Sequence, residues 1–187
     1  MYKERGFTSH DVVAKLRGIL HMKKIGHTGT LDPDATGVLP VCIGKATKVC
    51  GLLTDKDKTY RAVVKLGVTT NTEDMTGEIL AKHPVSVTKE QIEMAVSKFA
   101  GEIEQIPPMY SAIKINGKKL YELARQGKEV ERKARKVTIY EIKVLSIDFS
   151  ENEFTMEVSC SKGTYIRTLC EDLGRKTGGL ALGAVRR

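Results

Sequence analysis

A segment of twelve residues, GHTGTLDPDATG at positions 26–37, concentrates the side chains that could carry chemistry. It combines glycines, threonines and two aspartates with Pro33, which is more backbone specification than a connecting loop needs. Because Pro33 fixes its own φ and favours an extended preceding residue, the carboxylate of Asp32 would be presented from a rigid turn. The alternative is an Asx-turn, in which Asp32 and the threonines only satisfy amides of the loop.

A phosphate-binding loop is a second possible use of this region, because the chain continues as GVLPVCIGKAT. A Walker A loop needs Gly, four residues, and then Gly-Lys followed at once by Ser or Thr. Here Leu39 stands where the first glycine is required, and Lys45 is followed by Ala46. The spacing therefore argues against nucleotide hydrolysis.

The composition is that of a soluble globular protein, with 41% apolar and 29% charged residues. No stretch approaches the ~20 apolar residues of a membrane-spanning helix, and the N-terminus does not resemble a secretory signal, so we expect a cytoplasmic protein without membrane contact. The net charge of +8 indicates either a polyanionic partner or simply solvated lysines. We expect no bound metal, because no ligand-type spacing relates the cysteines (Cys42, Cys50, Cys160, Cys170) to one another or to the histidines (His10, His21, His27, His83).

Hydrophobic patterning predicts one α+β domain, with a mixed, mainly antiparallel sheet flanked by helices, to position these groups. Strands are expected over 38–43, 59–66, 136–149 and 153–160. In the strand 59–66, strict alternation places Tyr60 on the inward face, where it would be a core aromatic.

Helices are indicated by their caps and by apolar residues at helical spacing. They are expected over 9–22 with Ser9 as the cap, over 46–53, after the capping-box pair Thr88 and Gln91, over 118–126 with Gly127 as terminator, and from about Thr164 onward.

Five blocks of the sequence are specific enough to suggest a family: TSHDVVAKLR, KKIGHTGTLDPDATGVLPVCIGKATK, DKTYRAVVKLG, QIPPMYSAIKINGKKLYELARQG and SKGTYIRTLCEDLG. In this order they resemble the TruB family of tRNA pseudouridine synthases over nearly the whole chain. The resemblance implies the pseudouridine synthase fold, with residues 1–187 as catalytic domain. It implies that uridine at position 55 in the T loop of tRNA is isomerised, the uracil being detached and reattached through C5 without cofactor or metal. The implied partner is the T-arm of tRNA, and we expect a monomer.

The same resemblance assigns catalytic roles to three residues. Asp32 falls on the essential aspartate of the family motif; whether it attacks covalently or removes a sugar proton through a glycal stays open. Arg167 falls on the basic partner that would keep this carboxylate ionised, although an Arg in SKGTYIRTL could also be a helix-surface residue. Tyr60 falls on the active-site tyrosine, which is expected to stack on the flipped uracil.

Two further residues are expected at the RNA. By resemblance, His27 contacts the RNA near the extruded nucleotide and helps to hold its loop open, whereas a histidine in a glycine-rich loop could also be structural. Taking uridine out of its stack costs a few kcal/mol, so residues that stabilise the flipped state are needed. Tyr165 is expected as a second wall of the pocket.

Residues of about 105–136 are strongly basic and resemble the family's RNA-gripping insertion. The alternative is a solvated helix face. A phosphate stripe here would recognise the shape and backbone of tRNA and make binding steeply salt-dependent. The stripe would include Lys118, Lys119, Arg125, Arg132 and Lys133.

Both ends of the chain depart from the family pattern. Members usually begin with a strand and a K-P-x-G-x-T-S-H segment, where this chain reads MYKERGFTSHD, with Glu4-Arg5 in the place of Lys-Pro. Members also continue beyond a Leu-Arg-Arg motif, commonly into a PUA domain, whereas this chain ends in AVRR, so we expect no C-terminal PUA domain. A tRNA-binding or folding module with little catalysis is therefore the alternative to an active synthase. A guide-RNA-dependent synthase of the dyskerin type is less favoured, because the extensions that bind partner proteins are absent from the sequence.

Overall fold

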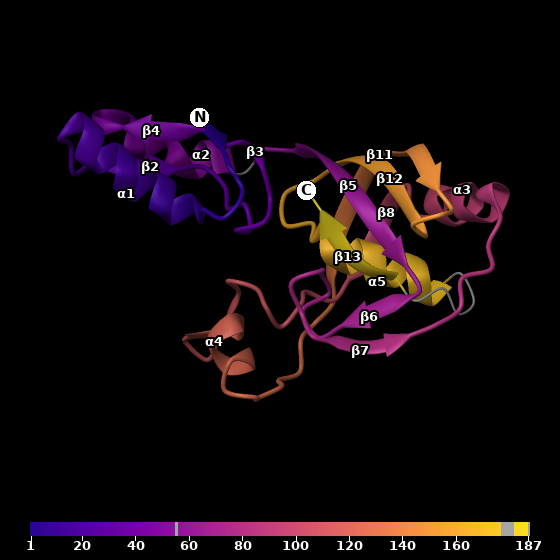
Figure 1. Cartoon of the computed structure of the whole chain (residues 1–187). Coiled ribbons are helices and arrows are strands. Elements are labelled where there is room, and N and C mark those ends of the chain that lie inside the picture. The colour runs from indigo at the N-terminus through magenta and orange to yellow at the C-terminus, as the bar shows by residue number, and fades with distance from the viewer. Residues whose placement is uncertain (55, 177–181, 187) are drawn as a thin grey trace. The chain divides into compact units, whose positions relative to one another are not determined.

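A computed structural model describes residues 1–54, 56–176 and 182–186, with side chains up to Arg175. The chain forms two compact units, 1–57 and 58–186, and each is described by itself. Figure 1 shows their elements along the chain.

The N-terminal unit begins with strand β1 (Tyr2–Lys3) and helix α1 (Ser9–Leu20). The helix cap is Thr8, not Ser9 as predicted: the Thr8 hydroxyl accepts from the backbone N–H of Asp11, and the Asp11 carboxylate accepts from the Thr8 N–H. Thr8 is the cap because Asp11, three positions after it, completes the capping box. Ser9 is the first helical residue and is 2% exposed.

Two short antiparallel pairs complete the N-terminal unit: β2 (Ile25–His27) with β4 (Val41–Ile43), and β1 with β3 (Gly37–Val38). The predicted strand 38–43 is thus broken into β3 and β4. Pro40 lies at the break, because proline has no N–H for a ladder, while its carbonyl accepts from Thr28 N. The predicted helix 46–53 is a 3-10 helix, η1 (Gly44–Val49), followed by α2 (Cys50–Thr54).

The second unit is built on a five-stranded antiparallel sheet in the order β13-β5-β12-β11-β8. Its strands are β5 (Lys58–Leu66), β8 (Gly101–Gln105), β11 (Arg135–Asp148), β12 (Glu153–Cys160) and β13 (Leu182–Arg186). The predicted alternation of β12 is confirmed, since every second residue from Phe154 to Cys160 is at most 3% exposed.

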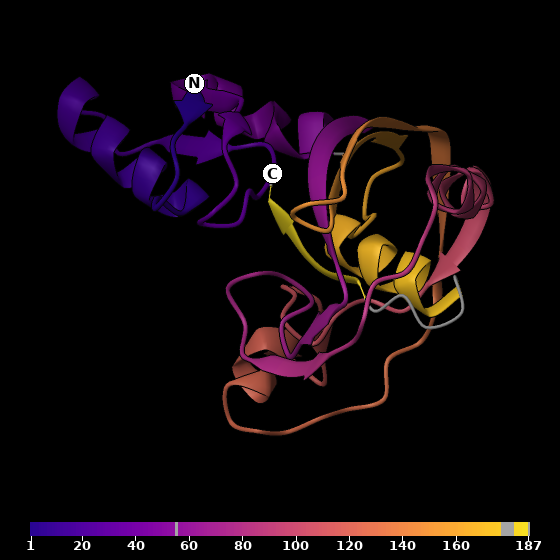
Figure 2. The ribbon, with the colours of Figure 1, turned by 45° about the vertical axis from the view of Figure 1, so that its right-hand side comes forward.

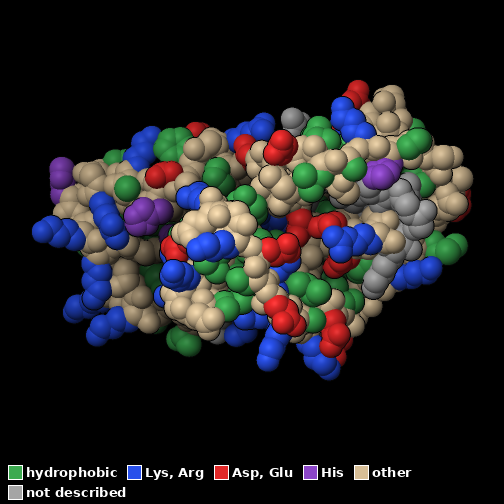
Figure 3. All heavy atoms as spheres, turned by 90° about the horizontal axis from the view of Figure 1, so that it is seen from below, with side chains coloured by type: hydrophobic (Ala, Val, Ile, Leu, Met, Phe, Trp, Pro, Cys, Tyr) green, Lys and Arg blue, Asp and Glu red, His purple; other side chains and the backbone are tan. Residues whose placement is uncertain are grey.

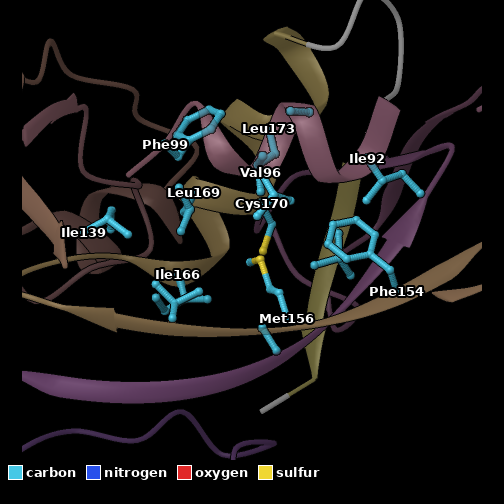
Figure 4. Packing of buried hydrophobic residues seen from close by; sticks show 14 of the residues in the cluster. Ile92, Val96, Phe99, Ile139, Phe154, Met156, Ile166, Leu169, Cys170 and Leu173 are labelled. Atoms are coloured by element: carbon cyan, nitrogen blue, oxygen red, sulfur yellow. The ribbon is translucent and has the colours of Figure 1, made fainter. Parts of the chain in front are cut away.

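Helices α3 (Lys89–Ser97) and α5 (Ile166–Lys176) cover one face of this sheet. Figure 4 shows their apolar side chains pointing between the helices and the strands, where Leu169 and Cys170 are fully buried. The predicted capping box of α3 is confirmed, with the Thr88 N–H donating to Gln91 Oε1 and the Gln91 N–H to Thr88 Oγ1. The buried cluster fixes α5, and with it Arg167, on the sheet.

Two excursions leave the sheet of the second unit (Figures 1 and 2). The first is the hairpin of β6 (Val68–Thr70) and β7 (Ile79–Lys82). The second runs from β8 to β11 and carries β9 (Lys114–Ile115), β10 (Lys118–Lys119) and α4 (Leu120–Ala124).

The predicted helix 118–126 is shorter than expected, because Lys118 and Lys119 belong to a tight hairpin. Asn116 and Gly117 both have positive φ values, of 50° and 80°, as an Asn-Gly hairpin turn requires. Gly127 follows the helix at φ 68° as its predicted terminator.

The predicted α+β class with a mainly antiparallel sheet is confirmed. Within the described residues, every helix is too short or too polar to cross a bilayer.

Candidate active site

The segment around Asp32 is held, residue by residue, by the first nine residues of the chain. Ser9 Oγ accepts from the Leu31 N–H at 2.9 Å and donates to the Leu31 carbonyl at 3.3 Å. The Pro33 carbonyl accepts from the Gly6 N–H at 2.9 Å and from Lys3 Nζ at 3.1 Å. The loop backbone is thus fixed also by residues outside the loop, which an Asx-turn alone does not require.

Lys3 lies under this loop with 0% exposure. Its ammonium donates to the carbonyls of Phe7 and Glu4 as well as to Pro33, so all three N–H groups have acceptors. Burial lowers the pKa of Lys3, while the nearby charges of Asp32 and Asp34 raise it. The buried ammonium thus brings a positive charge into the neighbourhood of the Asp32 carboxylate.

Lys3 also corrects the register expected for the N-terminus. Counting back from Gly6, Lys3 occupies the lysine position of K-P-x-G and Glu4 the proline position, instead of Glu4-Arg5 replacing the pair. Arg5 is exposed and pairs with Asp34 at 3.0 Å.

His27 ends β2 opposite Val41 and is half-buried. Its Nδ1 lies 2.6 Å from the carbonyl oxygen of Gly29, so Nδ1 carries the proton and donates. That bond fixes the ring and leaves Nε2 as the nitrogen that can make a further contact.

In the second unit, Arg167 lies in the first turn of α5 and its side chain is only 11% exposed. Its Nη1 is 3.6 Å from Oδ2 of Asp74, which belongs to the turn between β6 and β7. The other oxygen of Asp74 accepts from the Thr72 hydroxyl, the Thr76 hydroxyl and the Thr76 N–H. Arg167 is therefore not a fully exposed helix-surface residue, because most of its side chain is covered beside a carboxylate that the turn holds in place.

Tyr165 comes just before α5, and its backbone is clamped by Gln105 at the end of β8. Gln105 is 2% exposed; its side-chain oxygen accepts from the Tyr165 N–H at 2.8 Å and its amide donates to the Tyr165 carbonyl at 3.0 Å. The clamp ties the sheet to the start of the helix that carries Arg167.

Tyr60 lies near the start of β5, opposite Val158 on β12. It is half-buried and packs against the core cluster. It is therefore a core aromatic as the alternation predicts, with part of its surface still exposed for a second contact.

Glu73 is an acidic group near Arg167 that the sequence analysis missed. It has a left-handed backbone with φ 61° and accepts from the Thr168 hydroxyl at 2.6 Å. Burial raises the pKa of Glu73 to about 7, with Thr168 and Arg167 acting in the opposite direction and Glu171 adding to the rise. The start of α5 thus combines the mostly buried guanidinium of Arg167 with two acidic side chains, Asp74 and Glu73.

The basic side chains of residues 105–136 differ in their exposure and in their contacts within the protein. Lys119 and Arg125 both lie over the ring of Tyr121, at 5.3 and 5.4 Å from its centroid. Arg132 is mostly buried and donates to the Pro107 carbonyl, whereas Lys118 and Lys133 are exposed. Figure 3 shows one face of the molecule, on which Lys and Arg side chains lie among Asp and Glu side chains over part of the surface.

The predicted site residues therefore fall into two groups: Asp32 and His27 in the N-terminal unit, and Tyr60, Tyr165 and Arg167 in the second unit. Sequence reasoning missed Lys3, Glu73, Asp74 and Gln105. The run NTEDMTG has the composition of an Asx-turn and could have indicated Asp74. Among the described side chains, no group of three or more His, Cys, Asp or Glu is arranged to hold a metal ion.

The fold is that of the pseudouridine synthases. A chain of the crystal structure of a Cbf5-Nop10-Gar1 complex matches with a TM-score of 0.75 and 34% identity, over 100% of this chain and 46% of that chain. A chain of an H/ACA RNP bound to a substrate RNA containing 2'-deoxyuridine matches with a TM-score of 0.70 and 30% identity, over 100% and 44%.

Within this class the sequence is more specific. The family model described as TruB family pseudouridylate synthase (N terminal domain) matches residues 17–166, and the chain belongs to this family. It is 60% identical to tRNA pseudouridine synthase B of Alkaliphilus oremlandii over 176 residues, which are 94% of this chain and 58% of the relative. It is 55% identical to the protein of the same name from Bacillus pumilus over 183 residues, 95% of this chain and 59% of the relative. The chain thus spans about three-fifths of the length of these relatives.

Proposed function

We propose that this chain carries the catalytic part of an enzyme that isomerises uridine to pseudouridine in tRNA, with Asp32 as its essential carboxylate. The observation that carries the proposal is the fixed backbone on both sides of Asp32, through Leu31 and Pro33. It is supported by the names of the relatives, which are tRNA pseudouridine synthases. We further propose the T-arm as the part of tRNA that is bound, position 55 as the target, a monomer as the working state and the cytoplasm as its location.

The reaction requires three chemical steps. The glycosidic bond from N1 to C1′ must break, a bond from C5 to C1′ must form, and the proton at C5 must leave. An ionised carboxylate on a rigid loop can serve as nucleophile or as general base in this sequence. Because the loop around Asp32 is preorganised, little reorientation is needed when the nucleotide arrives.

The target uridine must also leave its stack. Unstacking costs a few kcal/mol, and stacking on an aromatic ring returns roughly 1 to 3 kcal/mol per base. Tyr60 would supply that ring from the edge of the core cluster. His27, through Nε2, would contact the RNA beside the extruded nucleotide.

Arg167 would provide positive charge for the phosphate of the flipped nucleotide. Its ion-pair partner Asp74, 3.6 Å away, restricts the guanidinium before RNA is bound. Exposed Lys118 and Lys133 would approach the RNA backbone from the excursion between β8 and β11.

The test is a product assay on a T-arm stem-loop labelled with tritium at C5 of its uridines. Isomerisation at position 55 releases that tritium, and we expect release equal to one uridine per RNA. A stem-loop with cytidine at position 55 is the matched control and should release none. Tight binding of the uridine RNA without release would favour a tRNA-binding or folding module, and equal release from both RNAs would contradict position 55.

A further inference from the structure

We infer that Ser9 is a positioning residue of the reaction, whose hydroxyl fixes the peptide group before Asp32 and thereby aims its carboxylate. The inference rests on the proposed function of Asp32. It concerns a residue that the sequence patterns assign to another task, the capping of α1.

The capping task is taken by another residue. Thr8 caps α1 through the reciprocal bonds with Asp11, so the Ser9 hydroxyl is not needed at the helix end. Ser9 is 2% exposed, and water therefore has little access to it. A buried hydroxyl needs protein partners, and both recorded partners of Ser9 Oγ are on Leu31, 22 residues along the chain.

The two bonds use the hydroxyl as donor and acceptor at once. Ser9 Oγ accepts from the Leu31 N–H at 2.9 Å and donates its proton to the Leu31 carbonyl at 3.3 Å. The side chains of Ser and Thr offer both functions at a single atom so close to the backbone. An alanine at this position would leave the Leu31 N–H without that acceptor.

The Leu31 carbonyl belongs to the peptide plane that enters Asp32. On the other side, the Asp32 carbonyl accepts from the Ala35 N–H at 3.0 Å, and the Pro33 carbonyl is held by Gly6 and Lys3. With the peptide planes before and after Asp32 both fixed, the φ and ψ angles of Asp32 are fixed too. The position of the Asp32 carboxylate then depends only on the two side-chain torsions, χ1 and χ2.

Ser9 holds the peptide plane between Leu31 and Asp32 through its Oγ atom alone. Removing this hydroxyl should therefore loosen Asp32 without changing the RNA-binding surface. A misplacement of about 1 Å can cost on the order of a hundredfold in rate. We therefore expect Ser9→Ala to lower the single-turnover rate of pseudouridine formation by 10- to 100-fold. The Kd for T-arm RNA should change by less than about threefold, and Ser9→Thr, which keeps the hydroxyl, should recover most of the rate.

Thr8→Ala is the matched control. It removes the cap of the same helix one residue away and leaves the Ser9–Leu31 bonds in place, so it should destabilise α1 without slowing the reaction. Equal rates for Ser9→Ala and Thr8→Ala, with wild type active, would overturn the inference while leaving the proposed function standing.

A second measurement does not depend on activity. Amide hydrogen exchange at Leu31 should accelerate at least tenfold in Ser9→Ala relative to wild type and remain unchanged in Thr8→Ala. Unchanged exchange at Leu31 in Ser9→Ala would refute the inference even if the wild-type chain made no pseudouridine. Ser9→Cys, close in volume to serine, serves the same comparison if Ser9→Ala fails to fold.

Discussion

The clamp between Gln105 and Tyr165 permits a quantitative prediction about how the start of α5 is held. Gln105→Met keeps a side chain of similar length and volume but removes both hydrogen bonds to the Tyr165 backbone. Because the volume is nearly preserved, the change creates little cavity, and the measured effect should report the bonds themselves.

The two bonds contribute differently. The Tyr165 carbonyl also accepts from the Leu169 N–H at 3.0 Å, so it keeps one partner when the Gln105 amide is lost. That loss should cost about 0.5–1.5 kcal/mol. The Tyr165 N–H would lose its recorded acceptor in a buried place, at about 1–3 kcal/mol. Together the substitution should lower the free energy of unfolding by about 1.5–4.5 kcal/mol.

Urea denaturation followed by circular dichroism measures this directly. Gln126→Met, the same change at an exposed position, is the control and should stay within about 0.5 kcal/mol of wild type. Product formation should fall in Gln105→Met as well, since Arg167 follows Tyr165 by two residues. A Gln105→Met protein as stable as the Gln126→Met protein would refute the reasoning.

Three further predictions follow from charged groups. First, because the folded pKa of Glu73 is raised from 4.5 to about 7, the folded state holds this proton more tightly, so its stabilisation is complete below pH 4.5 and is lost as the pH rises through 7. Glu73→Gln should remove that loss, which is at most about 3.5 kcal/mol at about 1.4 kcal/mol per pKa unit. Its melting temperature should exceed that of wild type at pH 8 and match it at pH 5, while Glu93→Gln, on an exposed helix face, should follow wild type at both. Second, Asp74→Asn leaves the mostly buried Arg167 without this carboxylate and should cost about 3 kcal/mol in urea denaturation, together with product formation; an unchanged stability would show that the pair is not structural. Third, if Lys118 and Lys133 each contact a phosphate, replacing both with alanine should flatten the log-log salt slope of RNA binding by about 1.5 to 2. Replacing Lys89 and Lys98, which lie outside the excursion, with alanine should leave the slope unchanged. An unaltered slope for the Lys118 and Lys133 variant would show that these two lysines do not contact phosphates.

Local patterns predicted those parts of the fold that local interactions decide. The capping box of Thr88 and Gln91 lies within four residues, and both of its bonds form as expected. The alternation in β12 and the helical spacing in α5 reflect one buried face each, so they also predicted the core correctly. At Ser9 and Thr8 two adjacent residues could both cap, and the acidic side chain of Asp11 decided between them.

The parts that the sequence did not reveal depend on contacts between distant residues. Gln105 and Tyr165 are 60 residues apart, and Glu73 and Thr168 are 95 apart, so no periodicity relates them. Lys3 looked like an ordinary charged residue near the N-terminus, yet three carbonyls make its burial possible. Arg132 was predicted to belong to a phosphate stripe. Its guanidinium donates to the Pro107 carbonyl, so it links two parts of the excursion between β8 and β11.

The candidate site was found from the sequence mainly through the family resemblance. Composition and spacing singled out the loop around Asp32 but left an Asx-turn open, and they favoured a surface position for Arg167. The structure adds the physical reason for the motif: the backbone on either side of Asp32 is bonded to Ser9, Gly6 and Lys3.

The chemistry is assigned to the Asp32 carboxylate, and a second acid in the same loop, Asp34, provides a matched comparison for that role. Asp32→Asn and Asp34→Asn each remove one negative charge from the same loop beside Lys3, and Asp34 is paired with exposed Arg5. In single-turnover tritium release from T-arm RNA, we expect Asp32→Asn to lose activity by at least about a thousandfold with RNA affinity nearly unchanged, and Asp34→Asn to stay within about threefold of wild type. Residual turnover of Asp32→Asn comparable to that of Asp34→Asn would contradict the account.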